Sequence, residues 1–174
     1  MWRMTALGTA VGLALGAGCA AAGAGASGGQ GASSSALADF SLPNTAGGEV
    51  RLSELVGKHV IYLDFWATWC GPCGSEMPQL QRLYETYKSQ GLVVIGVSMD
   101  DPTTMGTVAA YVHRTGLTFP VVIDADSRAT SLYNSTRSAP YGVLIDRSGR
   151  VVHEHAGYVS GDEVGLEAQI KAHL

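Results

Sequence analysis

Apolar residues in the middle of this chain gather in short runs that alternate with longer segments of helical spacing. The runs at 60–66, 92–97 and 141–146 are mostly apolar and rich in branched and aromatic side chains, which is typical of strands buried on both faces. Residues 72–90 repeat apolar side chains at helical spacing, and Gly91 can end that helix. The pattern predicts a sheet whose central strands are joined by helices.

Shorter elements extend this pattern toward both ends of the chain. Residues 40–43 and 49–52 alternate apolar and polar positions around a glycine-containing turn, which predicts an N-terminal hairpin. A turn at 147–150 leads into a strand at 151–156. Because strands alternate with helices and a hairpin comes late, we expect an α/β fold with a mixed sheet flanked by helices. The remaining elements are a helix from Asp101-Pro102 to Gly116, a strand at 120–124, a short helix at 127–133, and a final helix opened by a capping box of Ser160 and Glu163.

The first 19 residues have the pattern of a secretory signal. Arg3 supplies a positive start, and residues 6–17 are apolar and small but too few to span a bilayer, which takes about 20 residues. The segment Leu15-Gly16-Ala17-Gly18-Cys19 resembles the lipobox of bacterial lipoproteins, whose cysteine becomes the lipidated first residue. We therefore expect a lipid on Cys19. Ordinary cleavage within 20–26, which would discard Cys19, is the alternative.

Composition divides the rest of the chain into a linker and one domain. Residues 20–36 are nearly all Ala, Gly and Ser, so they should form a flexible linker that cannot offset the entropy of ordering. Residues 37–174 remain as a single domain, large enough for a core without disulfide or metal staples. A net charge of −4 leaves no basic surface for phosphates, which argues against a nucleic-acid partner.

The pair Cys70-Gly71-Pro72-Cys73 lies between the first central strand and the helix that follows it. Disulfide exchange needs a thiolate, and the unpaired N–H groups and dipole of a helix N-terminus lower the pKa of a thiol. Cys70, just before the helix, should be the exposed attacking thiol, and Cys73, in its first turn, the buried resolving thiol. Gly71 permits close approach, and Pro72 stiffens the turn.

A metal site is the structural alternative for this pair. A tetrahedral zinc site needs four ligands, and the sequence contains no second cysteine pair. His153 and His155 lie at strand spacing and face the same side, so they could complete a site only if the fold brings them near Cys70 and Cys73. Two histidines on the surface of an edge strand are the simpler interpretation.

The segment from Asp64 to Cys73 resembles the active-site segment of thioredoxins. The likeness extends to Pro78 inside the helix and to residues 138–146, which resemble the strand that follows the family's cis-proline, here Pro140. The TlpA/ResA-like branch is most similar, because it shares the N-terminal hairpin, a glutamate three residues after the second cysteine, and an added helix and strand at about 103–124. That branch consists of extracytoplasmic, membrane-tethered thiol–disulfide oxidoreductases. The resemblance implies a thioredoxin-like fold over residues 37–174.

The resemblance also implies roles for residues around the dithiol. Asp64 would be a buried carboxylate of raised pKa that accepts the proton of Cys73; a solvent-facing strand end is the alternative. Glu76 would act near the dithiol or would simply stabilise the helix dipole. Ala139 and Pro140 would present backbone on which a substrate chain pairs as an added strand. The supporting residues of the motif are Trp69, Gly71 and Pro72.

These observations lead us to expect a monomeric thiol–disulfide oxidoreductase that acts on protein thiols and disulfides. It would need no metal and no cofactor besides the Cys70–Cys73 disulfide. Gly-Pro between the cysteines resembles thioredoxin, whose potential is about −270 mV, so we expect a reductant. In the bacterial cell envelope such a reductant requires a membrane electron donor, and apocytochrome c thiols or copper-site cysteines would be its substrates by family likeness.

Two other functions remain open from the sequence. One is a peroxidase of the peroxiredoxin type, since the domains are related, although the proline and threonine that this chemistry places before its reactive cysteine are missing at the required spacing. The other is a non-enzymatic copper-binding or delivery module that uses Cys70, Cys73 and a histidine.

Overall fold

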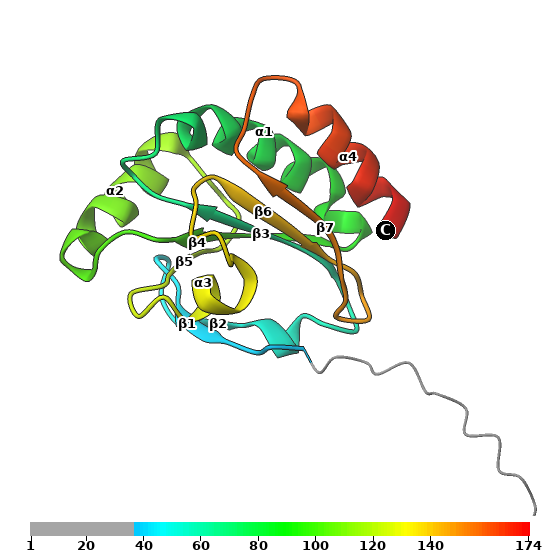
Figure 1. The fold of residues 1–174 in the computed structure, drawn as a ribbon, viewed down its shortest axis with the longest axis horizontal. Coiled ribbons are helices and arrows are strands. Elements are labelled where there is room, and N and C mark those ends of the chain that lie inside the picture. Colours follow the sequence, from blue (N-terminus) through cyan, green and yellow to red (C-terminus); the bar gives the residue numbers. More distant parts are fainter. Residues whose placement is uncertain (1–36) are drawn as a thin grey trace, which may run out of the picture. The chain divides into compact units, whose positions relative to one another are not determined.

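The computed structural model describes residues 37–174, so the predicted signal, Cys19 and the linker at 20–36 lie outside the described residues. The strands of this part are β1 (Ser41–Pro43), β2 (Glu49–Arg51), β3 (Val60–Trp66), β4 (Leu92–Ser98), β5 (Val121–Ile123), β6 (Tyr141–Ile145) and β7 (Val151–Ala156). A five-stranded mixed sheet has the order β5-β4-β3-β6-β7, and β1 and β2 form the separate hairpin (Figure 1). β3 pairs in parallel with β4 and antiparallel with β6, so the mixed sheet that the sequence predicts is confirmed.

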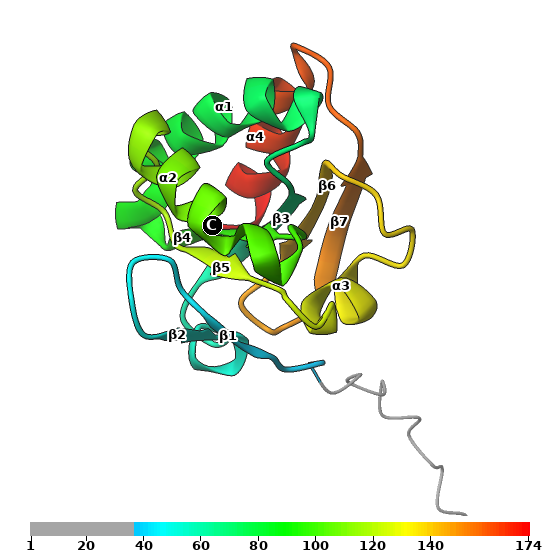
Figure 2. The same ribbon diagram turned by 90° about the vertical axis from the view of Figure 1, so that its left-hand side faces the viewer.

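Helices cover both faces of this sheet (Figure 1; Figure 2). The helices are α1 (Gly71–Tyr87), α2 (Met105–Thr115), α3 (Arg128–Tyr133) and α4 (Asp162–His173), with short 3₁₀ turns at Leu52–Glu54, Lys88–Gln90 and Pro102–Thr104. Helices α1, α2 and α4 pack on one face, whereas α3 and the hairpin pack on the other. None of the described helices has both the length and the apolar character needed to cross a membrane.

The central strand β3 is buried along its whole length and separates two cores. Because side chains alternate along a strand, Val60, Tyr62 and Trp66 join α1, α2 and α4 in one core. Ile61, Leu63 and Phe65 join α3 and the hairpin in the other. The same alternation directs the side chain of Asp64 to the face that α1 covers.

The predicted added segment consists of α2 and β5, and it extends the sheet beyond β4. Asp101 caps the 3₁₀ turn that precedes α2, and Gly116 ends the helix in a left-handed conformation with φ +69°. The turn of the hairpin then covers part of the β5 edge, since Asn44 bridges to Val122 and the N–H of Thr45 donates to the carbonyl of Val121.

The predicted capping box at Ser160 and Glu163 is wrong. The N-cap of α4 is Gly161, in a left-handed conformation with φ +111° and without a side-chain cap. The helix begins one residue later than the capping box requires. Glu163 therefore accepts a hydrogen bond from the N–H of Gly161, and Asp162 accepts one from the N–H of Val159. Two acidic side chains of the first turn thus accept hydrogen bonds from backbone N–H groups before the helix, in place of the reciprocal bonds of a capping box.

Replacing Gly142 by alanine should destabilise the domain by about 2 kcal/mol, a typical cost of overpacking a tight core. Gly142 lies on β6 opposite Asp64, and a Cβ there would overlap the hydroxyl and ring of Tyr62, which is itself buried. Gly165→Ala, at a helical position with open space, is the matched control and should stabilise slightly. Urea denaturation of both variants measures the difference, and equal midpoints would show that the core accommodates the methyl group.

Candidate active site

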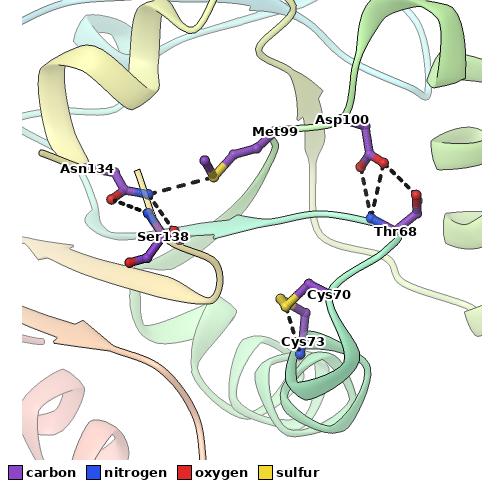
Figure 3. Close-up of a disulfide and its surroundings, with 7 residues drawn as sticks. All are labelled: Thr68, Cys70, Cys73, Met99, Asp100, Asn134 and Ser138. Atoms are coloured by element: carbon purple, nitrogen blue, oxygen red, sulfur yellow. Dashed lines mark hydrogen bonds between the residues drawn. A yellow bond between two sulfur atoms is a disulfide. The ribbon is translucent and has the colours of Figure 1, made fainter. Parts of the chain in front are cut away.

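Cys70 and Cys73 are joined by a disulfide at the N-terminus of α1 (Figure 3). Cys70 is the N-cap residue, and its sulfur accepts a hydrogen bond from the N–H of Cys73 at 3.3 Å. Pro72 stands at the start of the helix, where its missing N–H costs nothing. A sulfur at this position meets the unpaired N–H groups of the helix, which favour a thiolate once the disulfide is reduced.

Cys70 is the more accessible of the two cysteines, as expected, but it is buried in the disulfide form, so the prediction of an exposed Cys70 is wrong for this state. Its exposed fraction is 8%, against 1% for Cys73. The two sulfurs are bonded to each other, and both residues belong to the core beneath α1. The neighbouring Trp69 is 70% exposed. An exposed indole therefore stands beside the disulfide on the surface.

Asp64 is fully buried, so the alternative of a solvent-facing strand end is wrong. Neither oxygen of its carboxyl group has a hydrogen-bond partner among the described residues. Burial raises the pKa of Asp64 well above its usual range, and the charge of Glu76 raises it further. The site thus holds a carboxyl group that retains its proton at a pH where an exposed aspartate has lost it.

Glu76 follows Cys73 by one helical turn and is only 4% exposed. Its Oε2 atom has no hydrogen-bond partner among the described residues. Burial, with a smaller contribution from the charge of Asp162, raises the pKa of Glu76 to about 7. A carboxyl group that only stabilised the helix dipole would gain about 0.3–1 kcal/mol at the surface. Burying it without a partner costs more than that, which argues for a role inside the site.

Tyr62 joins these two acids on the α1 side of the sheet. Burial raises the pKa of the Tyr62 phenol well above its usual range, and the charges of Glu76 and Asp64 raise it further. Tyr62 and Asp64 come from β3, and Glu76 comes from α1, three residues after Cys73. All three have raised pKa values, and ionisation of Glu76 makes the protons of Asp64 and Tyr62 harder to remove.

A cavity of about 300 Å³ opens beside Glu76, between α1, β7 and α4. His153 and His155 line it from β7, with ring centroids 6.4 Å apart and nearly parallel planes, which confirms that they face the same side. His155 lies 3.2 Å from the carboxylate of Asp162. Burial lowers the pKa of His153, and the charge of His155 lowers it further. Among residues 37–174, no three His, Cys, Asp or Glu side chains are arranged to hold a metal ion.

The peptide bond between Ala139 and Pro140 is cis, as the sequence comparison with thioredoxins implies. Tyr141 pairs with Phe65, so Pro140 lies at the end of the sheet from which β3 leads into the cysteine loop. Ala139 packs against the core that contains both cysteines, and the carbonyl of Pro140 accepts a hydrogen bond from the N–H of Gly157 at 2.8 Å. The fold therefore brings the residues at 139–140 to the end of the sheet at which the cysteine loop begins, although 66 or more residues separate them from the cysteines in sequence.

Sequence reasoning missed two polar residues near the disulfide (Figure 3). Asp100 follows β4 and binds the N–H and the hydroxyl of Thr68, in the loop before Cys70. Asn134 follows α3 and binds the backbone of Ser138, two residues before Pro140. Both lie just after a regular element at the cysteine end of the sheet. Polar residues directly after an apolar strand were the available signal for Asp100.

Glu76→Gln should reduce the pH dependence of stability between pH 4.5 and 7. The folded protein retains the Glu76 proton up to a pKa of about 7, whereas the unfolded chain loses it near 4.5. The stabilisation is therefore complete below pH 4.5 and is lost as pH rises to 7, by about 3 kcal/mol from this group. Urea midpoints from pH 4 to 8 measure the change. The control is Glu85→Gln, at an exposed position of the same helix, which should still lose stability between pH 4.5 and 7. If Glu76→Gln lost as much stability as the wild type over this range, the raised pKa of Glu76 would be contradicted.

A cysteine pair at the N-terminus of a helix, on a sheet of this topology and beside a cis-proline, defines a thiol–disulfide oxidoreductase of the thioredoxin-like class. Residues 34–154 match the model of the AhpC/TSA family. The chain is 38% identical over 133 residues to the thiol-disulfide oxidoreductase ResA of Geobacillus kaustophilus, covering 76% of this chain and 74% of that protein.

Solved structures agree with this similarity. A putative thiol:disulfide interchange protein DsbE from Chlorobium tepidum superposes with a TM-score of 0.71 and 36% identity, over 77% of this chain and 92% of that one. A putative protein disulfide isomerase from Bacteroides thetaiotaomicron gives a TM-score of 0.70 and 32% identity, over 78% and 86% of the two chains. The chain belongs to the AhpC/TSA family and, within it, to the ResA-like thiol–disulfide oxidoreductases.

Proposed function

We propose that this protein reduces disulfides in partner proteins in the bacterial cell envelope, with Cys70 as the attacking thiol and Cys73 as the resolving thiol. The observation that carries the proposal is the position of the pair: Cys70 caps α1 with its sulfur, and Cys73 lies beneath it in the core. The cap position stabilises a thiolate on Cys70. The depth of Cys73 leaves Cys70 as the sulfur that a partner protein can reach.

The reaction would proceed in two exchanges. The Cys70 thiolate attacks one sulfur of the partner's disulfide, forms a mixed disulfide and releases the other partner sulfur as a thiolate. Cys73, as a thiolate, then attacks the sulfur of Cys70, which forms the Cys70–Cys73 disulfide and releases the second partner sulfur. Two electrons pass from the dithiol to the partner. The disulfide of the present structure corresponds to the product, so the cycle needs an electron donor to reduce it.

Asp64 would take the proton that Cys73 loses before the second exchange. The side chain lies on the α1 face of β3, and its carboxyl group is free of hydrogen bonds within the described residues. A base with a pKa well above the ordinary aspartate value is better matched to a thiol than an exposed carboxylate. Glu76 would share this role through its effect on the Asp64 pKa.

The partner chain would bind across the surface at Trp69, Ala139 and Pro140. The exposed indole of Trp69 supplies apolar contact area next to the disulfide. The backbone at 139–140 lies at the same end of the sheet as the cysteine loop and would pair with an extended segment of the partner. The predicted signal at 1–19 and the predicted linker at 20–36 support a domain that acts outside the cytoplasm. It would be tethered by a lipid on Cys19, near a membrane electron donor.

The reduction potential tests the direction of electron flow. Equilibration of the Cys70–Cys73 pair against glutathione or dithiothreitol buffers should give a potential near about −270 mV, the value of thioredoxin. A potential above about −150 mV would favour a disulfide-forming oxidant instead. Peroxide turnover by the reduced protein would support the peroxidase alternative, and we expect none because the proline and threonine of that chemistry are missing.

A further inference from the structure

A buried amide holds the turn that leads to Pro140. Asn134 ends α3, and its side chain is fully buried. Its Nδ2 donates to the carbonyl of Ser138 at 2.8 Å, and its Oδ1 accepts from the N–H of Ser138 at 3.3 Å and from the hydroxyl of Thr136 at 2.9 Å. The amide thus binds both backbone groups of Ser138, as a neighbouring strand would.

The same amide contacts the segment that follows β4. The Nδ2 of Asn134 lies 3.7 Å from the sulfur of Met99, and the N–H of Met99 donates to the carbonyl of Trp66 at 2.8 Å. Trp66 is the last residue of β3, directly before the loop that carries Cys70. The side chain of Met99 therefore contacts the amide that holds the turn at 138–140 (Figure 3), and its backbone binds the last residue of β3, before the cysteine loop.

The next residue, Asp100, holds the cysteine loop itself. Its carboxylate accepts the N–H of Thr68 at 2.9 Å and 3.2 Å with its two oxygens, and also accepts the hydroxyl of Thr68. The hydroxyl of Ser98 donates to the same carboxylate at 2.9 Å. Hydrogen bonds to an ionised acceptor are about twice as strong as neutral ones. The loop is therefore held two residues before Cys70.

Buried polar groups usually have partners, so satisfied hydrogen bonds alone do not indicate function. Here the partners lie in two irregular segments at the cysteine end of the sheet. Asp100 holds the cysteine loop directly, and the adjacent Met99 contacts the amide of Asn134 that holds the turn at 138–140. A shift of either segment would change the distance between a partner chain bound at 139–140 and the sulfur of Cys70. Misplacement of reacting groups by about 1 Å can cost on the order of 100-fold in rate.

We propose that Asn134 and Asp100 are positioning residues that hold the turn at 138–140 and the loop at 67–70 at a fixed separation through the segment Met99–Asp100. An extended segment bound at the turn then presents its disulfide to Cys70. This inference rests on the proposed function, because it requires that a partner chain pairs beside Pro140. It assigns the selectivity for polypeptide disulfides to residues that touch neither the partner nor the sulfurs.

The test compares two oxidants of the reduced protein: a disulfide-bonded peptide of about ten residues and the small aromatic disulfide DTNB. DTNB has no backbone to pair with the turn, so it reports the reactivity of Cys70 alone. Asn134→Ala should lower the second-order rate constant for the peptide at least tenfold and that for DTNB less than twofold. Met99→Leu, which keeps the volume but removes the sulfur, should show a smaller loss of the same selective kind.

Variants of Thr68 test the other half of the inference. Thr68→Val removes the hydroxyl that Asp100 holds, without a change of charge, and Thr68→Ser restores it. Thr68→Val should slow both oxidants severalfold and raise the apparent pKa of Cys70 in the pH profile of the DTNB reaction, because the sulfur then caps α1 less well. Thr68→Ser should recover both the rate and the profile.

A merely structural role would give a different result. Equal losses for the peptide and DTNB in Asn134→Ala, or no loss for either, would overturn the assignment of Asn134. An unchanged pH profile in Thr68→Val would overturn that of Asp100. If Asn134→Ala does not fold, Asn134→Ser and Met99→Leu answer the same question. A wild-type protein that reacts with DTNB but not with the peptide would contradict the proposed function itself, separately from this inference.

Discussion

A Cys73→Ser variant should accumulate mixed disulfides with its partner proteins, whereas a Cys70→Ser variant should accumulate few or none. The reason is the difference in depth between the two sulfurs. Cys70 caps the helix at the surface end of the motif, beside the exposed Trp69, and Cys73 is covered by the core. Without Cys73 the second exchange cannot occur, so the mixed disulfide through Cys70 persists.

Non-reducing gels of protein isolated after acid quenching would measure this accumulation, and mass spectrometry of the trapped species would identify the partners. The double variant Cys70→Ser/Cys73→Ser is the control for nonspecific capture. Turnover with a protein disulfide should fall by at least about 10³-fold in both single variants, as for loss of an activated nucleophile. More trapping in Cys70→Ser than in Cys73→Ser would reverse the two roles.

Asp64→Asn should make the protein more stable and less active at the same time. An ionised carboxyl group in this fully buried place is costly, because neither oxygen has a partner within the described residues. The asparagine has nearly the same shape but no charge to bury. At pH 8 we expect a gain of about 2 kcal/mol in the free energy of unfolding. We also expect a loss of about 100-fold in the rate at which Cys73 resolves the mixed disulfide.

The pH dependence gives the sign of the Asp64 effect. Its pKa is raised in the folded protein from an ordinary value of 3.8. The stabilisation is complete below pH 3.8 and is lost as pH rises through the folded-state pKa, because the unfolded chain releases this proton first. The difference between the variant and the wild type should therefore grow with pH. Chemical denaturation at several pH values measures it.

Asp101→Asn provides the opposite case in the same protein. Hydrogen bonds from Thr103 lower the pKa of this exposed carboxylate. The stabilisation that Asp101 provides is present above pH 3.8 and is lost as pH falls through the folded-state pKa. Asp101→Asn should therefore lower the free energy of unfolding above pH 3.8 and leave it unchanged at lower pH. If Asp64→Asn behaved like Asp101→Asn, or if it resolved the mixed disulfide as fast as wild type, the role of Asp64 as proton acceptor would be contradicted.

The buried polar groups of this site lower the stability of the fold and are proposed to serve proton transfer. Asp64, Glu76 and Tyr62 are polar groups placed in a core that would be more stable with apolar residues. The charge of Glu76 raises the pKa of both Asp64 and Tyr62, and the charge of Asp64 raises the pKa of Tyr62. Glu76→Gln should consequently lower the pKa of Asp64 toward its ordinary value, and the pH optimum of the resolving step should move to lower pH with it.

The order of the elements and the position of the cysteines could be predicted from the amino-acid sequence alone. A continuous apolar run at 60–66 and helical spacing after Pro72 are local patterns, and the backbone follows them with little help from distant residues. The cis-proline and the left-handed glycine at 91 followed from family likeness and from turn chemistry. The predicted capping box of Ser160 and Glu163 was wrong because Gly161, in a left-handed conformation, is the N-cap of α4 instead of Ser160.

Only the tertiary structure decided which side chains meet around the disulfide. Period-two alternation places Asp64 on one face of β3, but it does not say that Glu76 will share its environment or that Asp162 from α4 will raise the Glu76 pKa. Asp100 and Thr68 lie 32 residues apart and meet only because β3 and β4 are parallel and end together. Contacts across such distances depend on strand register and helix packing. A single sequence carries no local signal for either.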